Sequence, residues 1–271
     1  MDTIKGLLTL ALNYLQRMTI SRLIKQSQLY NYPLQHLPDN TYDAQGNIQG
    51  QKYSSDRASS PLIVFILGPP GAGKGTQSAA LCDKFSGLTH LSYGDLLRYH
   101  ESIPGDWVTT FPKRHGREGN RMLPADEAVD LLRQTIGKGK KGQDTWLVDG
   151  FPRNEKHVIA WLKVYPPAQC VFYLNCDRDV LLKRIHKRAA DGSGRAEDRD
   201  DNKAKERVDR SLRESREMLD VLRAHGTRII EIDANRGVEL VENELSTHFQ
   251  VSWGFIRYAL FVSVITYELQ R

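Results

Sequence analysis

A glycine-rich loop between a short apolar run and a helical pattern constrains this chain more than any other feature. Residues Leu62–Leu67 are continuously apolar, which is typical of a strand buried on both faces of a sheet. The run leads directly into Gly68-Pro-Pro-Gly-Ala-Gly-Lys-Gly-Thr76, and a helical pattern extends from Lys74 to Phe85. Glycines let backbone N–H groups converge on phosphate oxygens, and the helix adds the positive end of its dipole. The segment therefore predicts a site for the phosphates of a nucleotide.

Two side chains of this loop have expected roles of their own. Lys74 is placed to reach the β- and γ-phosphates, and Thr76 is placed near the metal ion that accompanies them. In the strict pattern Ser or Thr follows the lysine directly, but here a glycine intervenes. The other expected contacts to the nucleotide come from Gly71, Ala72, Gly73 and Gly75.

Further short apolar runs alternate with helical patterns along the chain. Strands are expected at 146–148, 170–174 and 228–232, with a weaker one at 89–91. Helices are expected at 124–136, 154–164, 178–190 and 203–224, and Pro124 suits the first turn of its helix. This alternation predicts an α/β fold, a five-stranded parallel sheet with helices on both faces. Ligands of such folds bind at the carboxyl ends of the strands.

Two further motifs accompany the ends of strands. Leu91-Ser-Tyr-Gly-Asp-Leu-Leu-Arg98 follows the weaker strand, and Leu147-Val-Asp-Gly-Phe-Pro-Arg153 ends the next one. Together with the phosphate loop, these motifs resemble the nucleoside monophosphate kinase family of the adenylate kinases, and most closely its UMP/CMP kinase branch. The resemblance covers about residues 62–249. It implies a P-loop NTPase fold and transfer of the γ-phosphoryl group of ATP, with Mg²⁺ as cofactor, to a nucleoside monophosphate.

The same resemblance implies roles for residues around the acceptor nucleotide. Arg98 and Arg153 would clamp the acceptor phosphate, a task that suits the planar fork of a guanidinium group. Asp149 would help to organise Mg²⁺ through water. An acceptor-binding insertion corresponds to about residues 96–122. The remaining candidates for the acceptor site are Tyr93, Met122, Leu123, Gly150, Asn154 and His157.

A basic segment after the fourth strand resembles the short lid of this family, at about residues 189–201. By this match, four arginines surround the transferring phosphoryl group: Arg184, Arg188, Arg195 and Arg207. The first of them would also contact ATP, and the last two would also contact the acceptor. Four acids compete for the role of holding the lid by ion pairs: Glu197, Asp198, Asp200 and Asp201.

The base of the acceptor is indicated less clearly. AMP-specific relatives carry Thr at the position of Tyr93 and UMP/CMP relatives carry Ala. At the position of His157, relatives have Gln for adenine or Asn for pyrimidines. Asn154, Trp161 and the short lid favour UMP and CMP, with dCMP as a further candidate, in pyrimidine nucleotide biosynthesis. The alternatives are an adenylate kinase, with AMP as acceptor, and a weakened ATP-binding relative with a regulatory role.

Composition limits the partners of the chain. The net charge of +5 suits anionic ligands, and because the basic residues fall in kinase motifs we do not expect nucleic acid to bind. The three cysteines show neither metal-ligand spacing nor an even disulfide framework, which fits reduced thiols inside the cell. We expect a monomer in the cytoplasm, with a nuclear location also open.

Both ends of the chain fall outside the kinase resemblance. Residues 1–25 form a basic, acid-poor amphipathic pattern that fits a mitochondrial targeting peptide or an accessory helix. The apolar stretch at 251–267 is interrupted by Arg257 and falls short of the ~20 apolar residues that a membrane span needs. We therefore expect no integral membrane segment, an N-terminal extension with a polar linker at 1–60, a kinase domain at 61–249 and an apolar tail at 250–271.

Overall fold

The computed structural model describes residues 61–108, 123–139, 145–192 and 196–250, and the side chains of 196 and 197 are not among the described parts. The expectations for the extension at 1–60, for the tail beyond 250, and for Met122 and Arg195 therefore lie outside the described residues. The same holds for most of the second half of the acceptor-binding insertion. In the part of the chain that is described, no helix has the length and apolar character needed to cross a membrane.

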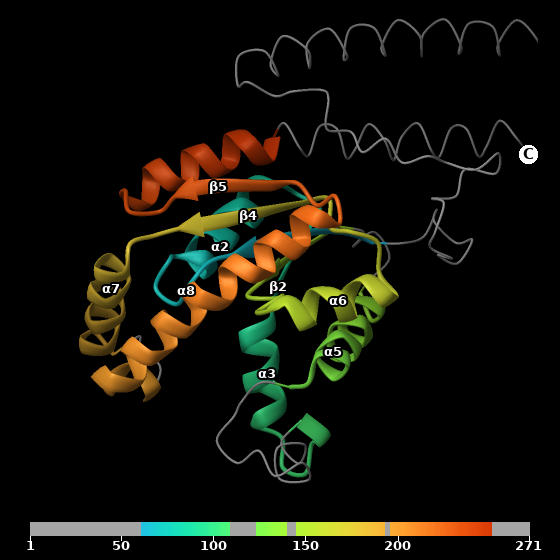
Figure 1. Cartoon of the computed structure of the whole chain (residues 1–271), viewed down its shortest axis with the longest axis horizontal. Coiled ribbons are helices and arrows are strands. Elements are labelled where there is room, and N and C mark those ends of the chain that lie inside the picture. Colours follow the sequence, from blue (N-terminus) through green and yellow to red (C-terminus); the bar gives the residue numbers. More distant parts are fainter. Residues whose placement is uncertain (1–60, 109–122, 140–144, 193–195, 251–271) are drawn as a thin grey trace, which may run out of the picture. The chain divides into compact units, whose positions relative to one another are not determined.

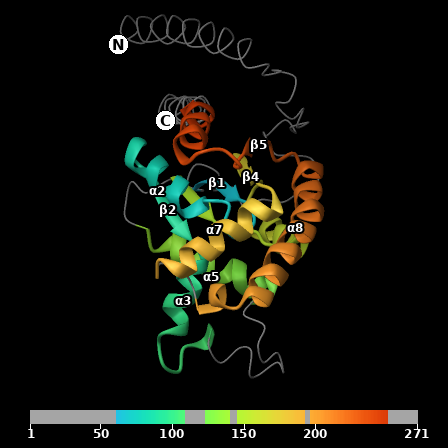
Figure 2. The ribbon, with the colours of Figure 1, turned by 90° about the vertical axis from the view of Figure 1, so that its left-hand side faces the viewer.

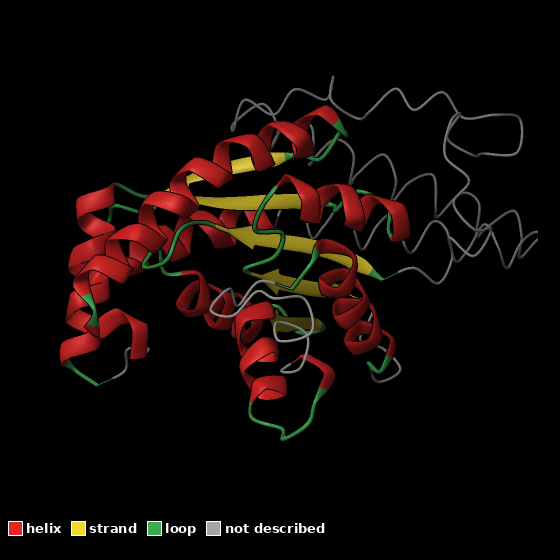
Figure 3. Ribbon diagram, turned by 60° about the horizontal axis from the view of Figure 1, so that its bottom comes forward, coloured by secondary structure: helices red, strands yellow, loops and turns green. Residues whose placement is uncertain are grey.

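Five parallel strands form a single sheet, which confirms the predicted fold class (Figure 1). Their order across the sheet is β2-β3-β1-β4-β5. The strands are β1 (Leu62–Leu67), β2 (Leu88–Ser92), β3 (Thr145–Asp149), β4 (Cys170–Asn175) and β5 (Ile229–Asp233). Every neighbouring pair of strands is parallel, and the strands lie side by side behind the helices in Figure 3. The order reverses at β1, which pairs with β3 on one side and β4 on the other, so the ligand crevice is expected at the carboxyl end of this strand.

Helices connect the strands and cover both faces of the sheet, as Figure 2 shows for α2 and α8. They are α2 (Lys74–Lys84), α3 (Tyr93–Glu101), α5 (Ala125–Gly137), α6 (Glu155–Val164), α7 (Arg178–Ala190), the 3-10 turn η3 (Ala196–Arg199) and α8 (Asp201–Ala224). A further helix occupies residues 238–250. The predicted helices are all present, with ends within two residues of the expected ones, but Pro124 lies just before α5 rather than in its first turn.

Helix α3 was not among the predicted helices, although it begins inside the second motif. The strand ends at Ser92 and the helix begins at the next residue. The Ser92 hydroxyl accepts a hydrogen bond from the backbone N–H of Asp95, at 3.2 Å. A serine followed three residues later by an acid is a helix-start signal, so the cap was present in the sequence. Arg98 consequently lies in the second turn of a helix and is not part of a loop.

An aromatic cluster on one face of the sheet anchors the third motif. The ring of Phe65 on β1 lies 5.2 Å from Trp161 of α6 and 6.1 Å from Phe151, centroid to centroid. Phe151 belongs to the Gly-Phe-Pro-Arg segment and is fully buried. Edge-to-face contacts of this kind add to the free energy of burial. The backbone that carries Arg153 is therefore fixed to the central strand.

The helix at 238–250 covers the opposite face together with α2. Phe249 packs on Phe85, with ring centroids 4.6 Å apart, and on Phe172 of β4, at 6.1 Å. Polar contacts join the two helices, because Gln77 donates to the backbone carbonyl of Val238 and Lys84 pairs with a glutamate of the second helix. This helix, which the sequence analysis did not predict, is thus part of the same folded unit as the phosphate loop.

Replacement of Phe249 by Ala tests that conclusion. The side chain is 1% exposed, so the Phe249→Ala change is expected to lower the free energy of unfolding by about 3 kcal/mol through lost burial and a residual cavity. The control is Leu240→Ala in the same helix, where a side chain 58% exposed predicts a change below about 0.5 kcal/mol. Urea unfolding followed by circular dichroism measures both, and equal values for the two variants would contradict the packing described.

Candidate active site

The phosphate loop is held between the end of β4 and the beginning of α7. A Cβ atom on Gly68 would lie 2.8 Å from the carbonyl oxygen of Leu174, and one on Gly71 would lie 2.8 Å from that of Leu181. Both glycines also have φ angles, +148° and +87°, that other residues rarely adopt. Glycine is therefore required at these two positions by close approach of the backbone as well as by conformation.

Lys74 is the first residue of α2 and its ammonium group lies over the loop. Its Nζ atom donates hydrogen bonds to the carbonyl oxygens of Gly68, at 2.7 Å, and Pro69, at 3.1 Å. The next two residues, Gly75 and Thr76, are exposed in the first turn of the helix. A positive side chain and the N-terminal amides of a helix are thus gathered at one point, as binding of an anion requires.

Asp149 faces the same loop from the end of β3. Its Oδ2 atom would lie 4.0 Å from a Cβ atom placed on Gly75, so the carboxylate borders the first turn of α2. A residue that the sequence analysis did not single out, His90 on β2, has its Nε2 atom 3.8 Å from the same oxygen. Within the described ranges, no group of three His, Cys, Asp or Glu side chains is arranged to hold a metal ion.

The two arginines expected at the acceptor phosphate converge above Gly94. A Cβ atom on this glycine would lie 3.4 Å from Nη1 of Arg98 and 3.7 Å from Nη2 of Arg153. Burial lowers the pKa of the Arg153 guanidinium, and the nearby positive charges of Arg207 and Arg98 lower it further, whereas Tyr93 and Asp149 raise it. Arginines from α3, α8 and the third motif therefore share one electrostatic neighbourhood, although Arg98 also pairs with Asp95.

One buried carboxylate joins the two helices that flank the lid. Asp198 accepts hydrogen bonds from Nε and Nη2 of Arg188 on α7, at 3.1 and 2.5 Å, and from Nη1 of Arg207 on α8, at 2.9 Å. Its side chain is fully inaccessible to solvent. Asp200 instead caps α8, and Asp201 pairs with His186 and Lys205, while the side chain of Glu197 lies outside the described residues.

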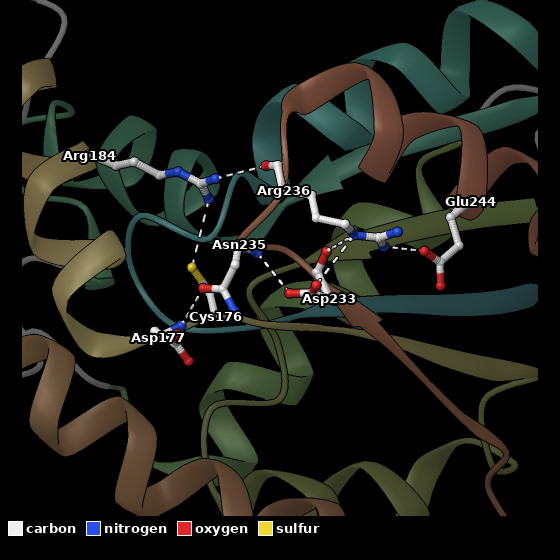
Figure 4. A network of polar contacts seen from close by, with 7 residues as sticks. All are labelled: Cys176, Asp177, Arg184, Asp233, Asn235, Arg236 and Glu244. Carbon is white, nitrogen blue, oxygen red and sulfur yellow. Dashed lines mark hydrogen bonds and ion pairs between the residues drawn. The ribbon is translucent and has the colours of Figure 1, made fainter.

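Arg184 points toward the loop that follows β5 (Figure 4). Its Nη2 atom donates to the backbone carbonyl of Arg236, at 3.1 Å, and its Nη1 atom lies 3.7 Å from the sulfur of Cys176. Arg236 in turn donates to the carbonyl of Asp233 and pairs with Glu244 of the 238–250 helix. The network joins α7 to the carboxyl ends of β4 and β5, at the same end of the sheet as the phosphate loop.

Several of the remaining residues predicted at the acceptor site are almost fully buried, whereas residues that line a ligand site are usually partly exposed. Tyr93 and His157 are each 1% exposed, and Leu123 is 4% exposed. Asn154 caps α6 by accepting a hydrogen bond from the backbone N–H of His157, and Gly150 has a φ of +74°. Contact of these residues with an acceptor stays a prediction, as do the roles assigned to Gly71, Ala72, Gly73 and the other loop residues.

Comparison with known proteins agrees with this geometry. A family model described as adenylate kinase matches residues 66–227, which is more than half of the chain. The chain belongs to the adenylate kinase family. This family assignment accounts for the order of the three motifs, and it identifies the chain as a nucleoside monophosphate kinase.

Curated relatives within the adenylate kinase family carry more specific names. The chain is 33% identical over 187 residues to the UMP-CMP kinase of Gallus gallus, covering 67% of this chain and 93% of that protein. It is 31% identical over 191 residues to the UMP-CMP kinase of Homo sapiens, covering 68% and 95%. The uridylate kinase of Schizosaccharomyces pombe is 33% identical over 180 residues, covering 66% and 92%.

Asp198 offers a test of the lid geometry in this adenylate kinase family member. The Asp198→Asn change removes the negative charge that pairs with both arginines. We expect it to lower the free energy of unfolding by about 2 kcal/mol. This is less than the usual cost of breaking a fully buried ion pair, because both arginines are partly exposed. Phosphoryl transfer should slow as well, because both arginines lose their fixed position. Asp201→Asn, at an exposed carboxylate, is the control and should change neither unfolding nor turnover.

The buried imidazole of His157 predicts a pH dependence of stability. Burial, and after it the charge of Arg153, lowers the pKa of His157 from 6.5 to about 4. The unfolded chain therefore binds a proton that the folded chain does not between these values, and stability should fall by about 1.4 kcal/mol per pH unit as the pH drops from 6.5 toward 4. Urea unfolding at several pH values should give a shallower dependence for His157→Asn than for the unchanged protein; parallel curves would refute the assignment.

Proposed function

We propose that this protein transfers the γ-phosphoryl group of ATP to UMP and CMP, with dCMP as a further acceptor. The observation that carries the proposal is the convergence of Arg98 and Arg153 above Gly94, while Lys74 lies over the phosphate loop. Two separate groups of positive charge suit two phosphate-bearing ligands, a donor and an acceptor. The choice of pyrimidine acceptors is supported by the relatives named UMP-CMP kinase and uridylate kinase.

The chemistry follows from positioning and charge. The phosphate of a nucleoside monophosphate is already an anion at neutral pH, so its oxygen can attack without a general base. The protein must hold the attacking and leaving oxygens in line and neutralise charge on the group that moves. In this proposal Lys74 contacts the donor, Arg98 and Arg153 orient the acceptor, and Arg188 and Arg207 stabilise the transferring group. Such donors are worth more in a site from which water is excluded.

Kinases of this family use ATP with its associated Mg²⁺, and the residues bordering the phosphate loop fit such an ion. Mg²⁺ prefers oxygen ligands and keeps several waters, so a site with few protein ligands is ordinary for it. Thr76 in the first turn of α2 and Asp149, whose carboxylate borders Gly75, would hold the ion, the latter through water. When bound, Mg²⁺ neutralises charge on the β- and γ-phosphates.

The shared carboxylate of Asp198 supports a role for the lid arginines in the same reaction. It keeps Arg188 and Arg207 together, and Arg207 is close enough to Arg153 to lower the pKa of that guanidinium. In our proposal these groups surround the phosphoryl group and exclude water, which limits hydrolysis of ATP. Arg184, one helical turn before Arg188 on α7, would contact ATP, and Arg195 would join the lid arginines.

An acceptor panel tests the proposal directly. ADP release is measured with ATP and Mg²⁺ and with UMP, CMP, dCMP or AMP as acceptor, and the diphosphate product is identified by chromatography. We expect turnover with UMP and CMP at least tenfold more efficient than with AMP. Preference for AMP would replace the proposal with an adenylate kinase, and the absence of turnover with all four acceptors would leave a regulatory ATP-binding relative.

Variants in the same assay assign the activity to this site. Lys74→Met and Arg153→Ala are each expected to lower kcat by at least ~10²-fold, the loss typical of a group that contacts the transition state. Lys163→Met is the control, because this exposed lysine pairs only at the surface with Asp126 and should leave the rate unchanged. Near-normal turnover in Lys74→Met would remove the lysine from the mechanism.

A further inference from the structure

Two residues that depart from the pattern of the relatives contact the same arginine. The family resemblance implies Thr or Ala at the position of Tyr93, and Gln or Asn at the position of His157. Both side chains are 1% exposed, so neither presents a surface that an acceptor base could touch in this conformation. Both instead touch Arg153. The two departures therefore have a common structural consequence.

Tyr93 supports the guanidinium group of Arg153 through its ring. The central carbon of the guanidinium lies 4.8 Å from the ring centroid, the geometry of a cation–π contact. The ring is fixed from behind by Phe151, whose centroid lies 5.4 Å away in an edge-to-face arrangement. Among the described residues its hydroxyl has no hydrogen-bond partner. The contact with the arginine is thus made by the ring and not by the hydroxyl.

His157 supports the backbone of the same residue. Its Nδ1 atom accepts a hydrogen bond from the backbone N–H of Arg153, at 3.2 Å, and the ring stacks on Phe151 with centroids 5.1 Å apart. Contact with the backbone of Leu123 also acts on the imidazole, where it opposes the larger effect of burial on the pKa of His157. The side chain therefore joins Arg153 to the segment that begins α5.

Arg153 needs such support because its neighbours repel it. Burial removes hydration of its charge, and Arg207 and Arg98 both place positive charge beside it, effects that the carboxylate of Asp149 offsets only in part, since the net pKa of Arg153 is lowered. The only hydrogen bond given by its side chain among the described contacts runs from Nε to the carbonyl of Gly150, at 3.2 Å. Without the ring and the imidazole, the guanidinium would be expected to turn away from the other arginines and toward water.

We propose that Tyr93 and His157 are positioning residues that hold Arg153 in place for the acceptor phosphate and do not read the acceptor base. The inference rests on the proposed function, because it assigns Arg153 to the acceptor. It has a specific consequence for selectivity. Changes at the two positions should weaken the binding of all nucleoside monophosphates alike, since these share the phosphate that Arg153 would bind. The ratio of the Kd of UMP to the Kd of CMP should stay unchanged.

Two pairs of variants distinguish a role in positioning Arg153 from a role in recognising the acceptor base. Tyr93→Leu removes the ring, whereas Tyr93→Phe keeps the ring and removes only the hydroxyl. His157→Leu removes the acceptor nitrogen and leaves the N–H of Arg153 without its partner, whereas His157→Asn keeps a polar group near the position of Nδ1. Thermal unfolding of each variant identifies any that fails to fold, and the conservative member of each pair keeps the test informative in that case.

The readouts are the Kd of UMP and CMP by isothermal titration calorimetry, followed by KM and kcat for each acceptor and KM for ATP. Tyr93→Leu should raise the Kd and KM of both acceptors by roughly three- to thirtyfold, the range expected for loss of a cation–π contact, with KM for ATP unchanged. His157→Leu should act in the same direction. Tyr93→Phe and His157→Asn should stay within about twofold of the unchanged protein, since each keeps most of the contact.

Three results would overturn the inference. Equal acceptor Kd values for Tyr93→Leu and the unchanged protein would show that the ring does not support the arginine. A shift in the ratio of UMP to CMP binding in Tyr93→Phe or His157→Asn would assign base reading to these side chains. If the unchanged protein binds neither UMP nor CMP, the proposed function fails and this inference fails with it, a result distinct from the first two.

Discussion

The repulsion between Arg153 and two neighbouring arginines is the interaction on which the rest of the site depends. Arg98 and Arg207 approach Arg153 from two different helices, and each like charge raises the cost of keeping it buried. The carboxylate of Asp149 offsets part of this cost from a distance, and the direct contacts are an aromatic face, a carbonyl oxygen and a neutral imidazole. Among the described residues no carboxylate forms an ion pair with Arg153, and in our proposal its charge is therefore available to the acceptor phosphate.

The order of strands explains why the donor and acceptor groups meet. The phosphate loop follows β1, at the centre of the sheet, and the two arginines that we propose for the acceptor, Arg98 and Arg153, follow β2 and β3 on one side of it. The lid helices α7 and α8 lie between β4 and β5 in the chain, on the other side. Since all five strands are parallel, each of these segments begins at the same end of the sheet, where the carboxyl ends of the strands lie. Residues far apart in sequence thus converge through topology alone.

Elements with a local signal were predicted from the sequence. Short apolar runs predicted all five strands, the one at 89–91 only weakly, and three- to four-residue periodicity predicted α7 from its first residue to its last. Sequence reasoning missed α3, whose nine residues begin inside a motif, and the helix at 238–250, which is identified by its packing on Phe85 and Phe172. The contacts of Tyr93 and His157 with Arg153 could not be predicted, because they join three separate segments through geometry that no residue spacing encodes. Of the three competing acids whose side chains the structure describes, Asp198 is the one that pairs with Arg188 and Arg207, and the sequence did not distinguish it from the others.

The single carboxylate of Asp198 acts as a spacer. Its two oxygens each accept from a different arginine, one on α7 and one on α8, so the distance between the guanidinium groups is set by the width of one carboxyl group. Long side chains that are otherwise free to adopt many rotamers become a rigid pair of fixed separation. The two arginine side chains have therefore lost most of their conformational entropy before a phosphate binds, so binding has less entropy to overcome.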